Sequence, residues 1–283
     1  YGKLVLGLGA DQIRLPLQGN AANEVITVND LEEYAQFRKM IEGKKRIVIL
    51  GAGLIGCEFA NDLVLGSYEV DVIDLAPQAL GRLLPEAAAQ ALQAQLSDAG
   101  VRWHFATTVQ SIDRNGDALT ITLANGSTIT SDVFLSAVGL RPRIDLAKTA
   151  GITTDQGITV NRQLETSAKN VFAIGDCAEV DGLVLPYVMP IMQAARALAP
   201  NLIGQSAILT YPAMPVMVKT PALPTIVSPP AKGAAGEWKI IPVEGGLEAR
   251  FESSDGKLLG FALLGSATAQ RGALTKELPP ILQ

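Results

Sequence analysis

Three glycines at fixed spacing, Gly51, Gly53 and Gly56, form the pattern that most directly predicts chemistry. An apolar, β-branched run typical of a buried parallel strand precedes them, and a helical pattern follows. In such a unit the first glycine permits a tight turn, the second lets backbone approach a pyrophosphate, and the third lets helix and strand pack closely. Free N–H groups at the helix start then face phosphate oxygens. The pattern predicts a dinucleotide site that includes Leu54 and Ile55.

An acidic residue completes this pattern. A second strand-like run ends in Asp74, 23 residues after Gly51, near the spacing expected for a carboxylate that binds an adenosine ribose 2′-hydroxyl. A carboxylate favours NAD over NADP because it repels a 2′-phosphate, although Arg82 is close enough in sequence to blur that preference. The alternative is a glycine-rich turn in an ordinary βαβ unit, with Asp74 at a solvated strand end. We favour the nucleotide site because strand, turn, helix and acid occur in order.

The composition limits the classes of function. The 283 residues suffice for two or three domains, and the 48% hydrophobic content allows a sizeable core. A net charge of −5 without a basic stripe argues against nucleic-acid binding. The sequence shows no apolar run of membrane-spanning length and no signal peptide. We therefore expect a cytoplasmic protein.

Few side chains are suited to acid–base, nucleophilic or metal chemistry. His104 is the only histidine, so we expect neither a Ser-His-Asp triad nor a metal site, and we assign no catalytic side chain. Cys57 and Cys177 are far apart and form no C-x-x-C pair. We expect His104 to be a structural or surface residue and both cysteines to be packed small residues. Hydride or electron transfer by cofactors fits this composition.

The order of predicted elements up to residue 142 describes a small nucleotide-binding domain. The final strand should return beside the first, which would put Val138 and Gly139 near the nucleotide crevice. The elements are a helix over 30–42, a βαβ unit over 45–74, a helix over 85–99, a strand over 101–105, an antiparallel meander with Asn-Gly turns at 115–116 and 125–126, and a returning strand over 132–142.

The pattern changes after residue 142, and from residue 208 it becomes β-rich, which predicts a separate α+β domain. A buried strand that ends in a glycine turn is also expected near the start of the chain, over 1–10. The later elements are a short helix over 145–150, strand-like runs over 157–160 and 170–178, a helix over 188–202, strands over 214–220, 223–227, 238–242, 247–251 and 257–264, and a closing helix over 268–278.

Three motifs, at 51–58, 136–142 and 171–178, occur in an order that resembles the pyridine nucleotide–disulfide oxidoreductase superfamily. Within it, residues 56–62, 187–190 and 218–221 resemble the rubredoxin reductase family, and the resemblance covers essentially the whole chain. It implies an α/β, Rossmann-like flavoprotein with two dinucleotide-binding domains and a C-terminal α+β domain. The implied segments are 1–24 (remainder of the FAD-binding domain), 25–142 (NAD(P)-binding domain), 143–206 (second part of the FAD-binding domain) and 207–283 (C-terminal domain).

The resemblance implies an oxidoreductase for electron transport, with FAD and NAD(P)H as cofactors and rubredoxin or a similar small iron protein as partner. Disulfide-reductase relatives carry two close cysteines near their first fingerprint, and this chain has none there. That difference points to an outside electron acceptor. Two alternatives stay open, a ferredoxin or nitrite reductase component of the same architecture and a non-catalytic NAD-binding remnant that cannot hold FAD. A purely structural or interaction protein has no positive signal.

The resemblance also implies residue roles. Glu58 matches a glutamate near the nicotinamide–flavin contact, and Asp176, after Gly175, matches the residue that holds the ribityl–phosphate side of the flavin. Val188 matches a residue whose backbone meets the flavin ring, and Lys219 matches a lysine close to it, where a cation would stabilise negative charge. The plainer interpretations are a solvated helix residue for Glu58, a turn cap for Asp176 and a surface lysine for Lys219.

The start of the chain departs from the family pattern. Family members begin with their own G-x-G-x-x-G on a βαβ unit that holds the FAD pyrophosphate, and residue 1 corresponds to the strand after that unit. At the end of this strand the usual Ala-(Thr/Trp)-Gly is Gly7-Leu8-Gly9, so Gly9 is the matching cofactor-binding glycine. We therefore expect a chain without most of its FAD-binding domain, either a fragment or one completed by a separate piece. The apolar faces of 1–10 and 174–176 should then be exposed.

Overall fold

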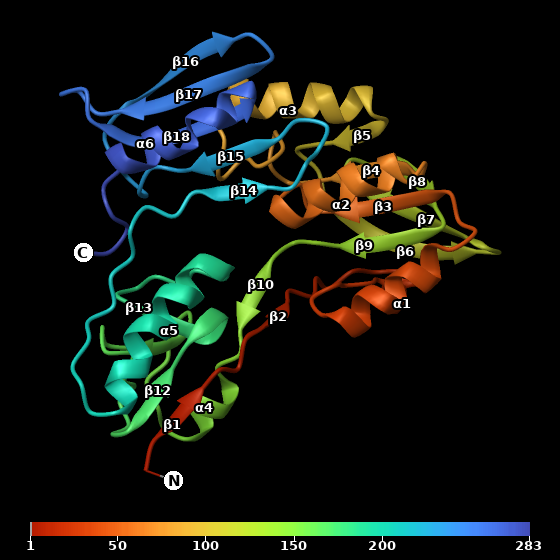
Figure 1. Cartoon of the computed structure of the whole chain (residues 1–283). Helices are drawn as coiled ribbons and strands as arrows, with labels where there is room; N and C mark the ends of the chain where they lie inside the picture. Colours follow the sequence, from red (N-terminus) through yellow and green to blue (C-terminus); the bar gives the residue numbers. More distant parts are fainter. Residues whose placement is uncertain (1) are drawn as a thin grey trace. The chain divides into compact units, whose positions relative to one another are not determined.

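The computed structural model describes residues 2–283, so Tyr1, the first residue of the predicted opening strand, lies outside the described residues. The chain forms two compact units (Figure 1). The first contains residues 2–13, 140–214 and 279–283, and the second contains residues 14–139 and 215–278. Each unit is described by itself.

The first unit consists of short strands and helices around one apolar core, which includes Phe172, Leu198 and Tyr211. Its described strands form three two-stranded sheets. The parallel pairs are β1 (Leu4–Leu6) with β12 (Val171–Ala173) and β11 (Ile158–Val160) with β13 (Ala178–Val180); β2 (Ala10–Gln12) is antiparallel to β10 (Leu140–Pro142). The helices are α4 (Asp145–Thr149), the 3-10 turn η2 (Gly175–Cys177) and α5 (Val188–Leu202).

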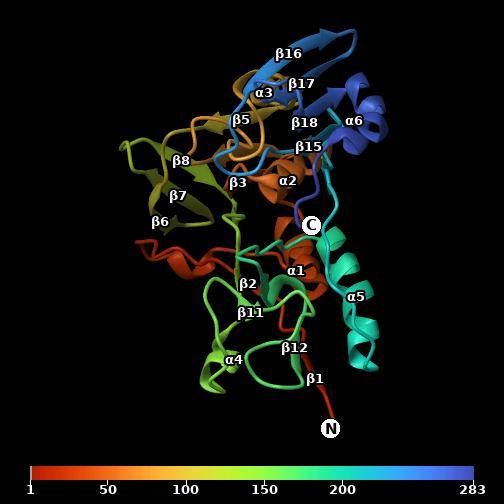
Figure 2. The same ribbon diagram turned by 90° about the vertical axis from the view of Figure 1, so that its left-hand side faces the viewer.

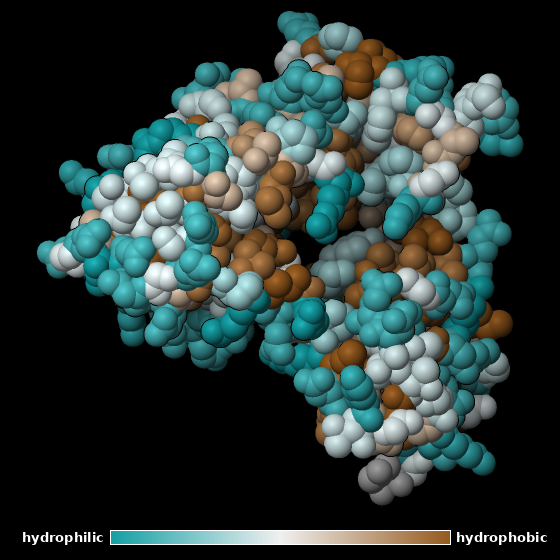
Figure 3. Space-filling model, turned by 180° about the vertical axis from the view of Figure 1, so that it is seen from behind, coloured by the Kyte–Doolittle hydropathy of each residue, from teal (hydrophilic) through white to brown (hydrophobic). Residues whose placement is uncertain are grey.

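The predicted strand over 1–10 with a glycine turn at its end is present as β1 followed by a turn at Gly9, but the strand itself is shorter than expected and β2 was not expected. Gly9 has φ +70°, a conformation that breaks an extended strand, and residues 10–12 pair instead with β10. In β1, Leu6 is buried, whereas Leu4 and Val5 are 37% and 38% exposed, as expected for this strand. On the face seen in Figure 3, hydrophobic residues in brown lie among hydrophilic residues in teal.

The second unit is built on a parallel sheet of order β5-β4-β3-β9. Because β9 pairs directly with β3, the predicted return of the last strand beside the first is confirmed. Ile47 and Ile49 face one side of the sheet and Val48 and Leu50 the other, and all four are buried, as expected for a central parallel strand. The strands are β3 (Arg46–Leu50), β4 (Glu69–Ile73), β5 (Val101–His104) and β9 (Val133–Ser136).

Helices cover one face of this sheet and an antiparallel meander covers the other (Figure 2). Asp30 caps the helix that precedes β3, since its carboxylate accepts from the Glu33 amide at 2.8 Å. The helices are α1 (Leu31–Ile41), α2 (Leu54–Leu65) and α3 (Glu86–Asp98), and a 3-10 turn η1 spans Ala22–Glu24. The meander is β6 (Val109–Asn115), β7 (Ala118–Leu123) and β8 (Thr128–Ser131).

A five-stranded antiparallel sheet of order β14-β15-β18-β17-β16 completes the second unit, and α3 packs against β17 and β18. The strands are β14 (Val216–Val218), β15 (Thr225–Ser228), β16 (Glu237–Val243), β17 (Gly246–Glu252) and β18 (Leu258–Gly265). The predicted closing helix is two elements, the 3-10 helix η3 (Ser266–Gln270) and α6 (Arg271–Glu277). Among residues 2–283, none of the helices combines the length and apolar character that a membrane span requires.

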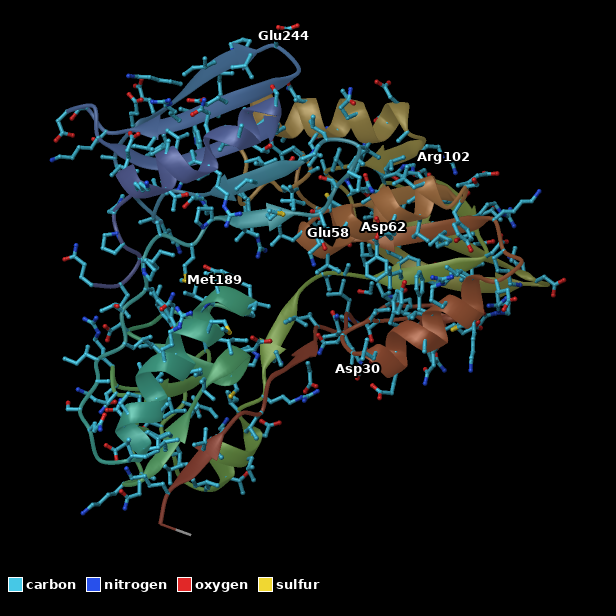
Figure 4. All side chains as sticks on the ribbon, viewed as in Figure 1. Asp30, Glu58, Asp62, Arg102, Met189 and Glu244 are labelled. Carbon is cyan, nitrogen blue, oxygen red and sulfur yellow. The ribbon has the colours of Figure 1, made fainter. Side chains whose placement is uncertain are left out.

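His104 lies in a charged group on the edge of the parallel sheet. Its Nε2 lies 2.8 Å from a carboxylate oxygen of Asp71. The Asp71 carboxylate also accepts two hydrogen bonds from Arg102, which is labelled in Figure 4. Burial pushes the pKa of Asp71 upward, but the hydrogen bonds from Arg102 and His104 outweigh it and hold the pKa below its ordinary value. The expected structural role of His104 agrees with this arrangement.

Replacing Gly56 with alanine should destabilise the second unit. A Cβ at Gly56 would lie 1.8 Å from the carbonyl oxygen of Gly51, so α2 would have to move away from β3. We expect Gly56→Ala to lower the free energy of unfolding by about 2–3 kcal/mol, as overpacked cores do. Urea unfolding followed by tryptophan fluorescence measures this, since Trp103 and Trp238 both lie in the second unit.

Gly53→Ala is the matched control. A Cβ there meets no atom within 4 Å, so the cost should be less than about 1 kcal/mol. Equal destabilisation by the two substitutions would contradict the close-packing role of Gly56.

Candidate functional site

The fingerprint glycines form a tight turn between β3 and α2. Gly51 has φ +110°, and a Cβ there would come within 2.5 Å of the Ala137 carbonyl oxygen. Gly53 is the N-cap of α2 and borders open space, so a ligand can approach its backbone. Leu54 and Ile55 begin the helix. The turn thus leaves amide donors at a helix N-terminus facing open space, which suits a phosphate.

Asp74 holds this turn in place. Its two carboxylate oxygens accept from the amides of Ala52 at 2.5 Å and Ala76 at 2.7 Å. A carboxylate has about four acceptor positions, so two such bonds leave capacity for ribose hydroxyls. The structure therefore gives Asp74 a second role, in fixing the loop, that its spacing from Gly51 did not reveal.

The segment after β9 lies against the same turn. The Ala137 amide donates to the Leu50 carbonyl at 2.7 Å, and the space for a Gly51 side chain is closed by Ala137 and the Val138 nitrogen. Gly139 follows with φ +112°. Val138 therefore stands beside the fingerprint, where the strand order predicted it.

Thr107 also stands near Asp74, and sequence reasoning missed it. Its amide donates to the Asp74 carbonyl at 3.2 Å, and its buried hydroxyl has no hydrogen-bond partner within the described chain. Buried polar atoms are nearly always paired, so an unpaired one is a candidate ligand contact. Its position just beyond the carboxyl end of β5 was the available signal, because ligands of parallel sheets bind at that edge.

Glu58 and Lys219 come together although 161 residues separate them. The Lys219 amide donates to Glu58 Oε1 at 2.9 Å. Figure 4 shows Glu58 and Asp62 on α2, and both line a pocket of about 530 Å³. Its other lining residues come from α1, α2, β14, β15, η3 and the turns beside them: Tyr34, Ile55, Phe59, Met217, Val218, Lys219, Thr220, Pro221, Pro224, Thr225, Ile226 and Thr268.

The remaining predicted residues belong to the first unit. Asp176 lies in η2, and its Oδ1 is buried without a hydrogen-bond partner among the described residues. Burial raises the pKa of this carboxyl. Gly175 has φ +81° and open space around its Cα. Gly9 accepts from the Arg143 amide at 3.0 Å, and Val188, the first residue of α5, is 70% exposed.

Neither cysteine is placed for thiol chemistry. Cys57 and Cys177 are fully buried, as expected of packed small residues. Burial, together with the negative charges of Asp74 and Glu58, raises the pKa of the Cys57 thiol to about 12. A thiol that stays protonated is a poor nucleophile.

The predicted site residues supply backbone N–H donors and carboxylate acceptors, and in the second unit Lys219 adds an ammonium group. In the second unit the fingerprint glycines, Asp74 and Val138 form one group, and Glu58 and Lys219 form another. The first unit carries Gly9, Gly175, Asp176 and Val188. Such groups bind and orient cofactors, which then perform the chemistry.

Two family models match the chain. Residues 1–199 match the model described as pyridine nucleotide-disulphide oxidoreductase, and residues 208–278 match the model described as rubredoxin binding C-terminal domain. Together these matches cover nearly the whole sequence.

Similar proteins carry related names. The chain is 49% identical over its full length to rubredoxin-NAD(+) reductase of Alcanivorax borkumensis and covers 74% of that protein. It is 48% identical over 287 aligned positions to rubredoxin-NAD(+) reductase of Acinetobacter baylyi, covering 73%. Among solved structures, a ferredoxin reductase of Rhodopseudomonas palustris superposes with a TM-score of 0.88 at 28% identity, over 100% of this chain and 72% of that one.

Replacing Asp176 with asparagine should stabilise the cofactor-free chain at neutral pH. The folded pKa of Asp176 lies above its unfolded value, so its stabilising effect is present at low pH and is lost as pH rises through the unfolded and then the folded pKa. The asparagine side chain is neutral, so the variant buries no charge at position 176. We expect Asp176→Asn to unfold at a higher temperature than wild type at pH 7, and the difference to shrink near pH 3.5, about where free aspartate is protonated.

Circular dichroism during heating at both pH values measures this. Asp155→Asn, at an exposed turn of the same unit, is the control and should change little at either pH. If the difference in unfolding temperature between Asp176→Asn and wild type is the same at low pH, the ionised form of Asp176 is not what destabilises the wild-type fold.

Proposed function

The chain belongs to the pyridine nucleotide-disulphide oxidoreductase family, and on that premise we propose that it is an NAD(P)H-dependent flavoprotein reductase that passes electrons to rubredoxin. The observation that carries the proposal is the 49% identity, over the whole chain, with a protein named rubredoxin-NAD(+) reductase. The match of residues 208–278 to a rubredoxin-binding domain supports the choice of partner. We also propose a cytoplasmic location, where NAD(P)H is available.

We assign the nucleotide site to the fingerprint of the second unit. Gly53 and the first amides of α2 would hold the pyrophosphate, since the backbone there is open to a ligand. Asp74 would accept from the adenosine ribose with its remaining lone pairs, and Val138 and Gly139 would line the same crevice. Glu58, a turn further along α2, would meet the nicotinamide end.

FAD is the second cofactor that the proposal requires, and the residues present fit it. Asp176 has a buried oxygen without a partner, which suits a ribityl hydroxyl donor, and the open space at Gly175 leaves room beside it. Gly9 and the backbone of Val188 would contribute further contacts. When bound, FAD takes a hydride from NAD(P)H and releases electrons one at a time. The exposed Lys219 ammonium would favour the negative charge of the reduced ring.

We further propose the four segments expected from the sequence. Residues 25–142 would act as the NAD(P)-binding domain and 207–283 as the partner-binding domain. Residues 1–24 and 143–206 would both serve the FAD-binding domain. The family match over 208–278 begins at nearly the boundary that we propose.

A ferredoxin is the second candidate acceptor. One observation favours it, the TM-score of 0.88 with a ferredoxin reductase at 28% identity. The rubredoxin-binding match over 208–278 favours rubredoxin, so the two acceptors are best compared directly.

Replacing Asp74 with serine should weaken NADH binding more than NADPH binding. Serine removes the charge-assisted hydrogen bonds to the ribose, which are worth about 1.5–3 kcal/mol, and also the repulsion of a 2′-phosphate. We expect the dissociation constant of NADH to rise at least about tenfold, with a much smaller rise for NADPH. Titration calorimetry with both nucleotides measures the ratio, and an unchanged ratio would argue against the ribose role.

The reductase activity can be tested with the flavin-loaded protein. NADH should bleach its visible flavin absorbance, and added rubredoxin should then be reduced faster than ferredoxin. Asp176→Ala should purify without flavin and lack both activities, because the oxygen proposed to hold the ribityl chain is gone. Asp155→Ala is the control, with normal flavin content expected. Normal flavin content in Asp176→Ala would contradict the assignment of Asp176 to the ribityl chain. If ferredoxin is reduced faster than rubredoxin, ferredoxin is the acceptor instead.

A further inference from the structure

Two side chains of α2 hold one short segment of the C-terminal sheet region. Glu58 Oε1 accepts from the Lys219 amide at 2.9 Å, and Asn61 Oδ1 accepts from the Ala222 amide at 3.1 Å. We call this pair of hydrogen bonds the α2 clamp. Glu58 and Asn61 are three residues apart, so they lie on the same face of the helix. The two hydrogen bonds of the clamp hold the segment 219–222 at both of its ends.

The clamp also completes the hydrogen bonding of this segment. The Thr220 amide donates to the Val218 carbonyl and the Leu223 amide to the Thr220 carbonyl, while Pro221 has no amide hydrogen. The amides of Lys219 and Ala222 are the ones that depend on α2. Without Asn61, the Ala222 amide would lose its partner in the fold, and such a loss is unfavourable.

Asn61 is a polar residue of α2, yet its side chain is 0% exposed. Its amide nitrogen lies 3.3 Å from Asp62 Oδ1, which leaves its oxygen directed to Ala222. A buried amide that joins segments 161 residues apart fixes their relative position in a way that an apolar contact would not, because hydrogen bonds are directional.

We propose that Asn61 is a positioning residue, which through the Ala222 amide holds segment 219–222 against α2 and so sets where Lys219 stands relative to Glu58. This inference rests on the proposed function, in which Lys219 and Glu58 serve the flavin and the nicotinamide. The α2 clamp then ties the nucleotide-binding helix to the domain that matches rubredoxin-binding proteins. Without Asn61, α2 would hold the segment only through the hydrogen bond from the Lys219 amide to Glu58, and the segment could turn about that bond and move the Lys219 side chain.

The test uses one disruptive variant, a substitute for it and one control. Asn61→Leu keeps the branched shape of the side chain but removes the acceptor, and Asn61→Ser, whose side chain is shorter, serves if the leucine variant does not fold. Ser131→Ala is the matched control, because Ser131 is also 0% exposed and its hydroxyl bonds the Arg46 and Val133 carbonyls elsewhere in the second unit.

The first measurement is amide hydrogen exchange by NMR, which requires no cofactor. In Asn61→Leu the Ala222 amide should exchange at least about tenfold faster than in wild type, with the Leu223 amide as an internal reference. Ser131→Ala should leave the exchange rate of the Ala222 amide unchanged. Unchanged exchange at Ala222 in Asn61→Leu would overturn the proposal.

The second measurement is the rate of flavin reduction by NADH in the flavin-loaded protein, followed by stopped flow without oxygen. In Asn61→Leu the limiting rate should fall about tenfold or more, because small misplacements of reacting groups are costly, while the NADH dissociation constant should change less than about twofold. If the Ala222 amide exchanges faster in Asn61→Leu but the flavin is reduced at the wild-type rate, Asn61 has a merely structural role and the proposal is overturned. A wild-type flavin that NADH does not reduce would contradict the proposed function, and the exchange measurement alone would then decide on the α2 clamp.

Discussion

The second unit depends on one close approach of backbone to backbone. The turn after β3 touches the segment after β9 so closely that no side chain fits at Gly51, and α2 begins so close to that turn that none fits at Gly56. Because β3 lies between β4 and β9, this contact fixes the helix N-terminus relative to the ends of both neighbouring strands. Asp74 and Val138 stand at those ends. The proposed nucleotide site is therefore a consequence of packing at two glycines rather than of any catalytic side chain.

The two acidic residues assigned to cofactors differ in how their charge is satisfied. Asp74 receives two amide hydrogen bonds, so its ionised form is compensated inside the fold. Asp176 has a buried oxygen without a partner, and such an atom costs about 1–3 kcal/mol. Folded chains tolerate such a cost mainly at functional positions. Asp74 thus fixes the turn after β3, whereas Asp176 keeps an acceptor that a donor from outside the chain could use.

Local signals predicted much of the fold. The fingerprint after β3 and the extent of α5 follow from neighbouring residues, and the structure reproduces them. The features that were not predicted depend on distant partners. The strand β2 forms because β10, far along the chain, pairs with residues 10–12. The contact of Asn61 was missed for the same reason, since it joins residues that are far apart in the sequence.

The chemistry proposed for this chain requires side chains that position cofactors rather than side chains that react themselves. Cys57 stands in α2, where burial and two nearby carboxylates raise the pKa of its thiol to about 12, which disfavours the thiolate that thiol chemistry needs. Electrons from a bound nucleotide would then have to leave through a second cofactor and an outside acceptor. If cofactors carry the reaction, the protein contributes distance and orientation. A buried amide such as Asn61, which performs no chemistry itself, then matters as much as a charged group, because it determines where Lys219 can stand.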